Sequence, residues 1–132
     1  MRNIFLIVVF MVVAKFSFSL SIYPKKFEKD ITKGNGENFI IINDTNERKV
    51  YKLDAIMNEE DINAKIFPKV FILNPNERKD VKVFLIPNKK IKNNIYKGNL
   101  LIQTLSMNIR EKQNLKLNFH MDIYATVNKK EI

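Results

Sequence analysis

The amino-acid sequence predicts an all-β fold in which two antiparallel sheets pack face to face as a sandwich. Three observations indicate this fold: apolar residues recur at every second position, turn signals separate these runs at short intervals, and no stretch shows a convincing helical period. The chain has 132 residues, which fits one modest domain and leaves no room for a second core. Seven short strands in a chain of this length fit an immunoglobulin-like sandwich best.

The predicted strands lie between clusters of turn-forming residues. The clearest clusters are Lys33–Gly36, Asn43–Asn46 and Asn74–Glu77, which are rich in Gly, Asn, Asp and Pro. A break in the first strand near Pro24 is an open alternative. The predicted strands are 20–31, 37–43, 48–57, 64–73, 79–87, 95–105 and 114–127.

The last predicted strand has the clearest alternation in the chain. Every second residue from Leu115 to Val127 is apolar, and the residues between them are mostly polar. This pattern predicts one long strand with an apolar face and a polar face. His120 falls on the polar face, where no catalytic role is expected for it.

The first residues have the pattern of a secretory signal peptide. Met1-Arg2-Asn3 is a short positive region, and the eleven residues from Ile4 to Ala14 are all apolar. A membrane span needs about 20 apolar residues, and this run is much shorter. We expect cleavage after Ser19, which leaves residues 20–132 as the exported domain; an uncleaved anchor is the alternative. With the signal removed, no stable membrane span is expected.

Composition excludes several classes of protein. The chain has no Cys and a single His, so disulfides, thiolate metal sites and multi-histidine clusters are excluded. Apart from Glu59-Glu60-Asp61, an acidic loop that we expect to be solvated, its carboxylates are spread singly over loops. Three glycines cannot form a phosphate cradle, so we expect no enzyme, no cofactor and no small-molecule substrate. The net charge of +9 comes from scattered lysines without interleaved stacking aromatics, so no nucleic-acid partner is expected.

Three stretches, taken in order, resemble the N-terminal domain of PapD-like periplasmic chaperones, which assemble pili. The first is Leu20–Lys26, an apolar alternation followed by Pro-Lys-Lys. The second runs from Phe67 through Asn74-Pro75-Asn76-Glu77 to Val83, and the third is Ile95-Tyr96 leading into Leu100–Ile102. Cytoplasmic major sperm protein domains have a similar pattern, and the export signal argues against them.

The resemblance implies a protein-binding module that adds a strand to an incomplete client, such as a pilin-like or other surface subunit. By the family pattern, the strand-donating side chains would be Leu115, Leu117 and Phe119. Lys26 stands where the family carries an arginine that pairs with the client's C-terminal carboxylate. Lysine supplies the positive charge but cannot form the bidentate hydrogen bonds of a guanidinium group. The family's second cationic anchor would fall near Tyr124, which is not basic. The chain ends at Ile132, so the family's second domain is expected to be missing.

Two alternatives stay open at this point. The apolar face of the last strand can simply form the core of the sandwich, with Lys26 an ordinary surface residue. The protein can also be a structural or accessory envelope component that self-associates or contacts anionic surface polymers.

Tyr96 is expected at a sheet corner with its hydroxyl bonded to the backbone. Asn43-Asp44-Thr45 matches a glycosylation acceptor, which we treat as a chance match.

Overall fold

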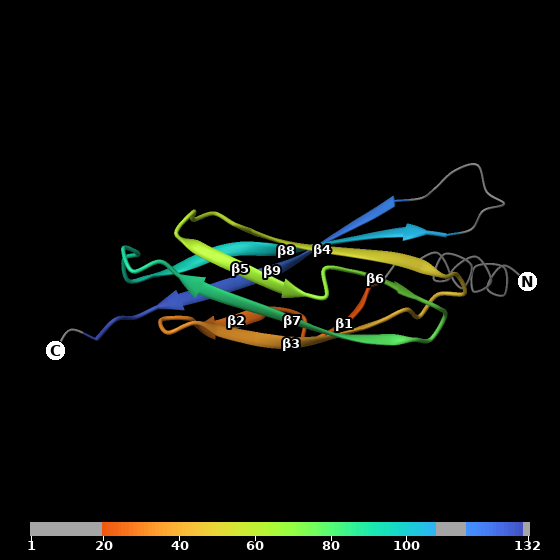
Figure 1. Cartoon of the computed structure of the whole chain (residues 1–132), viewed down its shortest axis with the longest axis horizontal. Helices are drawn as coiled ribbons and strands as arrows, with labels where there is room; N and C mark the ends of the chain where they lie inside the picture. Colours follow the sequence, from red (N-terminus) through yellow and green to blue (C-terminus); the bar gives the residue numbers. More distant parts are fainter. Residues whose placement is uncertain (1–19, 108–115, 131–132) are drawn as a thin grey trace, which may run out of the picture.

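A computed structural model of the chain describes residues 20–107 and 116–130 (Figure 1). The predicted signal peptide and the strand-donor candidate Leu115 lie outside the described residues. All regular structure in the described part is β. The strands are β1 (Ser21–Tyr23), β2 (Phe27–Asp30), β3 (Asn35–Ile42), β4 (Lys49–Met57), β5 (Ile62–Phe67), β6 (Val70–Leu73), β7 (Arg78–Pro87), β8 (Asn94–Ser106) and β9 (Lys116–Val127).

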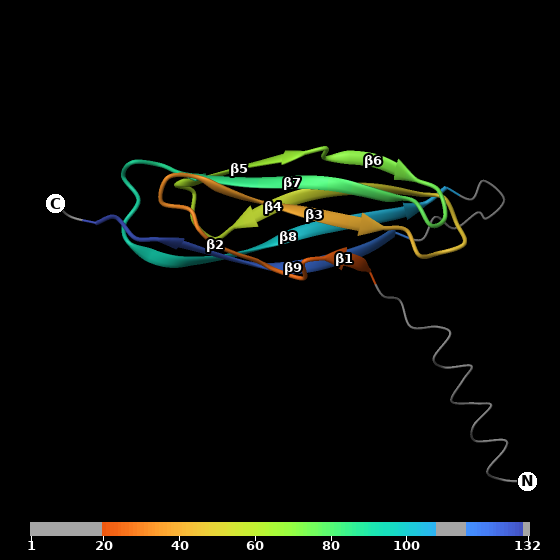
Figure 2. The ribbon, with the colours of Figure 1, turned by 90° about the horizontal axis from the view of Figure 1, so that it is seen from below.

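The strands form two sheets packed face to face, which confirms the predicted sandwich (Figure 2). One sheet has four strands in the order β1-β3-β7-β5, and the other has five in the order β2-β9-β8-β4-β6. All pairings are antiparallel except that of β2 with β9, which is parallel. Within the described residues, no helix is long and apolar enough to cross a membrane.

The chain forms nine strands where the sequence predicted seven segments, because two predicted strands are each divided between the sheets. The first breaks at Pro24, so that β1 pairs with β3 and β2 pairs with β9. The predicted strand 64–73 breaks at Pro68, so that β5 joins one sheet and β6 the other. Proline has no N–H to donate to a ladder, and each proline stands where the chain leaves one sheet for the other.

The core lies between the sheets and follows the alternation in the sequence. Val81, Val83 and Leu85 on β7 are at most 1% exposed, and the residues between them face outward. On β9, Met121, Ile123, Ala125 and Val127 are buried in the same way. Alternation therefore predicted which face of each of these strands packs inward.

Gly98 on β8 allows β4 to approach closely. A Cβ atom at this position would lie 2.5 Å from the carbonyl oxygen of Ile56 and 2.5 Å from Sδ of Met57. Because the carbonyl belongs to the backbone of the paired strand, an added methyl group would force the two strands apart. The sequence alone did not mark this glycine.

We expect Gly98→Ala to lower the free energy of unfolding by about 1–3 kcal/mol, the usual range for overpacking. Urea denaturation with a constant m-value measures the change. Lys97→Ala is the matched control, since Lys97 precedes Gly98 on the same strand and is exposed. Equal stability of the two variants would contradict the close approach.

A free strand edge as the candidate functional site

The two margins of β9 are paired to different extents. Along one margin β9 pairs with β8 from Lys116 to Val127 without interruption. Along the other, β2 pairs only with the stretch from Ile123 to Thr126. The first half of β9, residues 116–122, therefore has no strand beside it on this margin within the described part of the chain (Figure 1).

Hydrogen bonding shows which residues of β9 face the open margin. The carbonyl of Thr126 accepts from the N–H of Ile31, so Thr126 directs its backbone groups toward β2. Backbone groups of alternate residues point to opposite sides of a strand, and the pairing with β8 has no bulge. Asn118 and His120 therefore present their N–H and C=O groups to the open margin. Such groups are a template for another strand.

The side chains predicted to be donated lie on the inner face of this half-strand. Leu117 and Phe119 are both half-buried, and Phe119 packs against the core. They differ from Met121, the next residue on that face, which is 6% exposed. The inner face of β9 is thus less covered at Leu117 and Phe119 than at Met121.

Lys26 lies immediately before the point where β2 begins to cover β9. Phe27 is opposite Ile123 and Glu28 is opposite Tyr124, so the non-basic Tyr124 lies close to Lys26. The Lys26 ammonium contacts the Glu28 carboxylate at 2.7 Å, and both side chains are well exposed. The hydrogen bond to Glu28 and the charge of Glu28 raise the pKa of Lys26 above its ordinary value.

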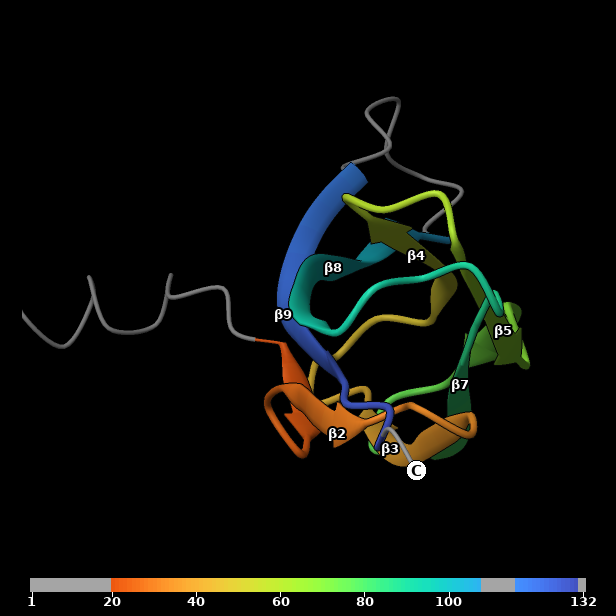
Figure 3. The same ribbon diagram turned by 90° about the vertical axis from the view of Figure 1, so that its left-hand side faces the viewer.

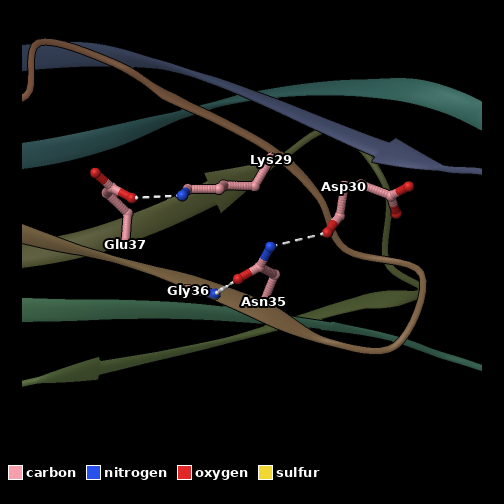
Figure 4. A network of polar contacts seen from close by, with 5 residues as sticks. All are labelled: Lys29, Asp30, Asn35, Gly36 and Glu37. Atoms are coloured by element: carbon pink, nitrogen blue, oxygen red, sulfur yellow. Dashed lines mark hydrogen bonds and ion pairs between the residues drawn. The ribbon is translucent and has the colours of Figure 1, made fainter.

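A polar network ties β2, the edge strand of the five-stranded sheet, to β3 of the other sheet (Figure 4). The Lys29 ammonium on β2 lies 3.0 Å from the Glu37 carboxylate on β3, which belongs to the other sheet. In the connecting turn, the Asn35 side-chain amide donates to the Asp30 carbonyl, and its oxygen accepts from the Gly36 N–H. This network joins the end of β2 and the turn after it to β3.

Other residues singled out from the sequence have structural roles. The Tyr96 hydroxyl donates to the Lys92 carbonyl, as predicted. His120 is exposed and its Nδ1 lies 3.0 Å from Oδ1 of Asn99, which agrees with a place on the polar face. Asn43 is fully buried with its amide bonded to backbone groups, a role that the glycosylation-like pattern did not indicate. Among the described residues, no three acidic or histidine side chains form a potential metal site.

Comparison with known proteins identifies the fold through structures alone. No protein-family model and no curated protein matches the sequence. The SSP-19 protein of Caenorhabditis elegans, an MSP-domain-like family member, superposes with a TM-score of 0.64 at 16% identity, over 82% of this chain and 100% of that one. The PapD-like domain 7 of human CEP192 superposes with a TM-score of 0.63 at 9% identity, over 85% and 87% of the two chains. The chain has a PapD-like fold.

Pilus chaperones share this fold over part of their length. The Escherichia coli chaperone DraB superposes with a TM-score of 0.57 at 11% identity, over 83% of this chain and 56% of that one. The chain therefore spans about half the length of this chaperone. The PapD-like and MSP structures match equally well, so the fold by itself does not separate the two groups.

Proposed function

We propose that this chain is an exported, non-catalytic protein-binding module of the pilus-chaperone kind, which binds a client by strand addition along the open margin of β9. The observation that carries the proposal is that, among the described residues, no strand pairs with residues 116–122 on the second margin of β9. An extended polypeptide would satisfy the outward N–H and C=O groups of Asn118 and His120. The pattern of residues 1–19 supports a place outside the cytoplasm.

The position of Lys26 supports one direction for the client strand. β2 runs parallel to β9 and begins at Phe27. A client strand that continues the line of β2 in the same direction would run beside Lys116 to Asp122 and end at Lys26. A C-terminal carboxylate would then meet the Lys26 ammonium. Lys26 would have to give up its ion pair with Glu28 to bind this carboxylate. The loss is small, because exposed ion pairs contribute only about 0–1 kcal/mol.

The inner face of the open half-strand indicates the client's side chains. Leu117 and Phe119 are half-buried, so apolar client side chains placed beside them would complete the cover of the core margin. The client is therefore expected to present apolar residues at alternate positions before its C-terminus. Two of the structures that share the fold were determined as chaperone complexes with pilus subunits, CsuC–CsuE and SafB–SafA.

Proline at Asn118 tests the open margin directly. Asn118→Pro removes an N–H that faces the open margin and leaves the ladder with β8 intact, so we expect it to abolish co-purification of the client with the full chain. Asn118→Ala is the matched control, because it removes the side chain and keeps the N–H. Retention of a client at defined stoichiometry by both Asn118→Pro and Leu117→Asp would rule out strand addition at β9.

The alternative of a self-associating envelope component uses the same open margin with a second copy as the partner. Light scattering on the full chain separates the two functions. A chaperone-like module is expected to have the mass of a monomer when its client is absent, whereas a structural component forms oligomers alone. Oligomers that Asn118→Pro dissociates would favour the structural component.

A further inference from the structure

β4 and β5 lie on the side of the sandwich away from β9 (Figure 3). A groove lies between their margins. It has a volume of about 310 Å³. Its apolar lining includes the half-buried Ala55 and Met57 from β4, together with Ala64 and the buried Ile66 from β5. The groove thus opens directly onto the margin of the core.

The β4 side of this groove is an unpaired strand edge. β6 covers β4 only from Lys49 to Lys52, and one further bond joins the Leu53 N–H to the Lys69 carbonyl. Ala55 and Met57 lie on the same side of the strand as Leu53, because backbone groups alternate. Their N–H and C=O groups therefore point into the groove, where no strand of the described residues is hydrogen-bonded to them.

The β5 side is also open. β5 pairs with β7 from Ile62 to Phe67 and is the last strand of its sheet. Within the described part of the chain, the groove thus has an unpaired backbone margin on each side. Its lining is largely polar, and Ala55, Ala64 and Ile66 form the apolar part of its floor. The complement of such a groove is an extended polypeptide, whose backbone can bond to β4 while alternate side chains reach the floor.

Charge at the rim selects the kind of peptide. Asp54, Glu59 and Glu60 line the groove, against a single cation, Lys69. None of these three carboxylates forms an ion pair within residues 20–107 and 116–130; Glu59 accepts only a long bond of 3.4 Å from the Asp61 N–H. The groove thus carries a net negative charge in a protein whose net charge is +9.

We propose that the β4–β5 groove is a second binding site, which takes an extended basic peptide segment of another protein. The peptide adds to the free edge of β4 in line with β6, places small apolar side chains over Ala55 and Ala64, and directs lysine or arginine to Glu59 and Glu60. This site is separate from the open margin of β9, since the two lie at opposite margins of the five-stranded sheet.

Fluorescence anisotropy of the full chain with labelled eight-residue peptides tests the site. Each probe peptide alternates valine and threonine and ends in two lysines. In the matched control peptide, two glutamates replace the two lysines. The lysine peptides are expected to bind and to slow hydrogen exchange at Ala55 and Met57. Glu59→Gln with Glu60→Gln is expected to weaken binding about fivefold to tenfold, as loss of two exposed ion pairs would, and added salt is expected to weaken it as well.

Two backbone variants locate the binding. Ala55→Pro removes the N–H in the groove and is expected to abolish binding, whereas Ala55→Ser retains the N–H and binding. Asn118→Pro, which blocks the β9 margin, is expected to leave it unchanged. The proposal is overturned if no lysine peptide binds, if lysine and glutamate peptides bind equally, if Asn118→Pro rather than the glutamine pair abolishes binding, or if a second copy of the chain fills the groove.

Discussion

Asn43→Ala should lower the free energy of unfolding by about 2–4 kcal/mol, because it leaves several buried polar groups without partners. The Asn43 side chain is fully buried after β3. Its amide donates to the carbonyls of Glu47, at 2.8 Å, and Leu73, at 3.0 Å, and its oxygen accepts from the N–H and the hydroxyl of Thr45. This one side chain thus joins the turn after β3 to the end of β6.

Asn46→Ala is the matched control for this effect. Asn46 lies in the same turn and is exposed, so its replacement should change stability by less than about 0.5 kcal/mol. Asn43→Asp separates the donors from the acceptors: it keeps the oxygen that Thr45 uses and loses the two donated bonds, so we expect it to be as destabilising as alanine. Urea denaturation measures all three variants, and an Asn43→Ala protein as stable as the Asn46→Ala protein would contradict the buried network.

The fold could be predicted from the sequence because its main signals are local. Alternation on β7 and β9 is a property of neighbouring residues, and it identified Val83 and Ile123 as core positions. The turn at Asn43 was also visible, as a cluster of turn-forming residues. Its burial was not, because that depends on the Leu73 carbonyl, thirty residues along the chain.

The candidate sites could be predicted only in part, because free margins depend on which strands become neighbours. The last strand was expected to be long and partly exposed, but the point where its cover ends is set by the register between Phe27 and Ile123. The groove beside Ala55 arises because β6 is shorter than β4, which follows from the strand break at Pro68. Neither register nor relative strand length has a local signal in one sequence.

Phe27 and Phe67 form a matched pair for the strongest test of the packing. Phe27 is the first residue of β2 and is 0% exposed, whereas Phe67 ends β5 and is 80% exposed. Removing a buried phenylalanine side chain costs about 3–5 kcal/mol, since both transfer free energy and packing are lost. The same substitution at an exposed position is nearly neutral, within about 0.5 kcal/mol.

We therefore expect Phe27→Ala to lower the unfolding free energy by about 3–5 kcal/mol, and Phe67→Ala to leave it nearly unchanged. Denaturant unfolding measures both.

Hydrogen exchange provides a second readout, which follows from the register. Tyr124 directs its N–H toward β2, so loosening β2 should speed hydrogen exchange at Tyr124. Exchange at Ala125, whose N–H faces β8, should stay slow. Loosening β2 also extends the open margin of β9 beyond Asp122 and displaces Lys26. Under the proposed function, Phe27→Ala should therefore weaken the binding of a client even where the sandwich stays folded. Equal losses of stability in the two alanine variants would mean that β2 does not seal the core at this margin.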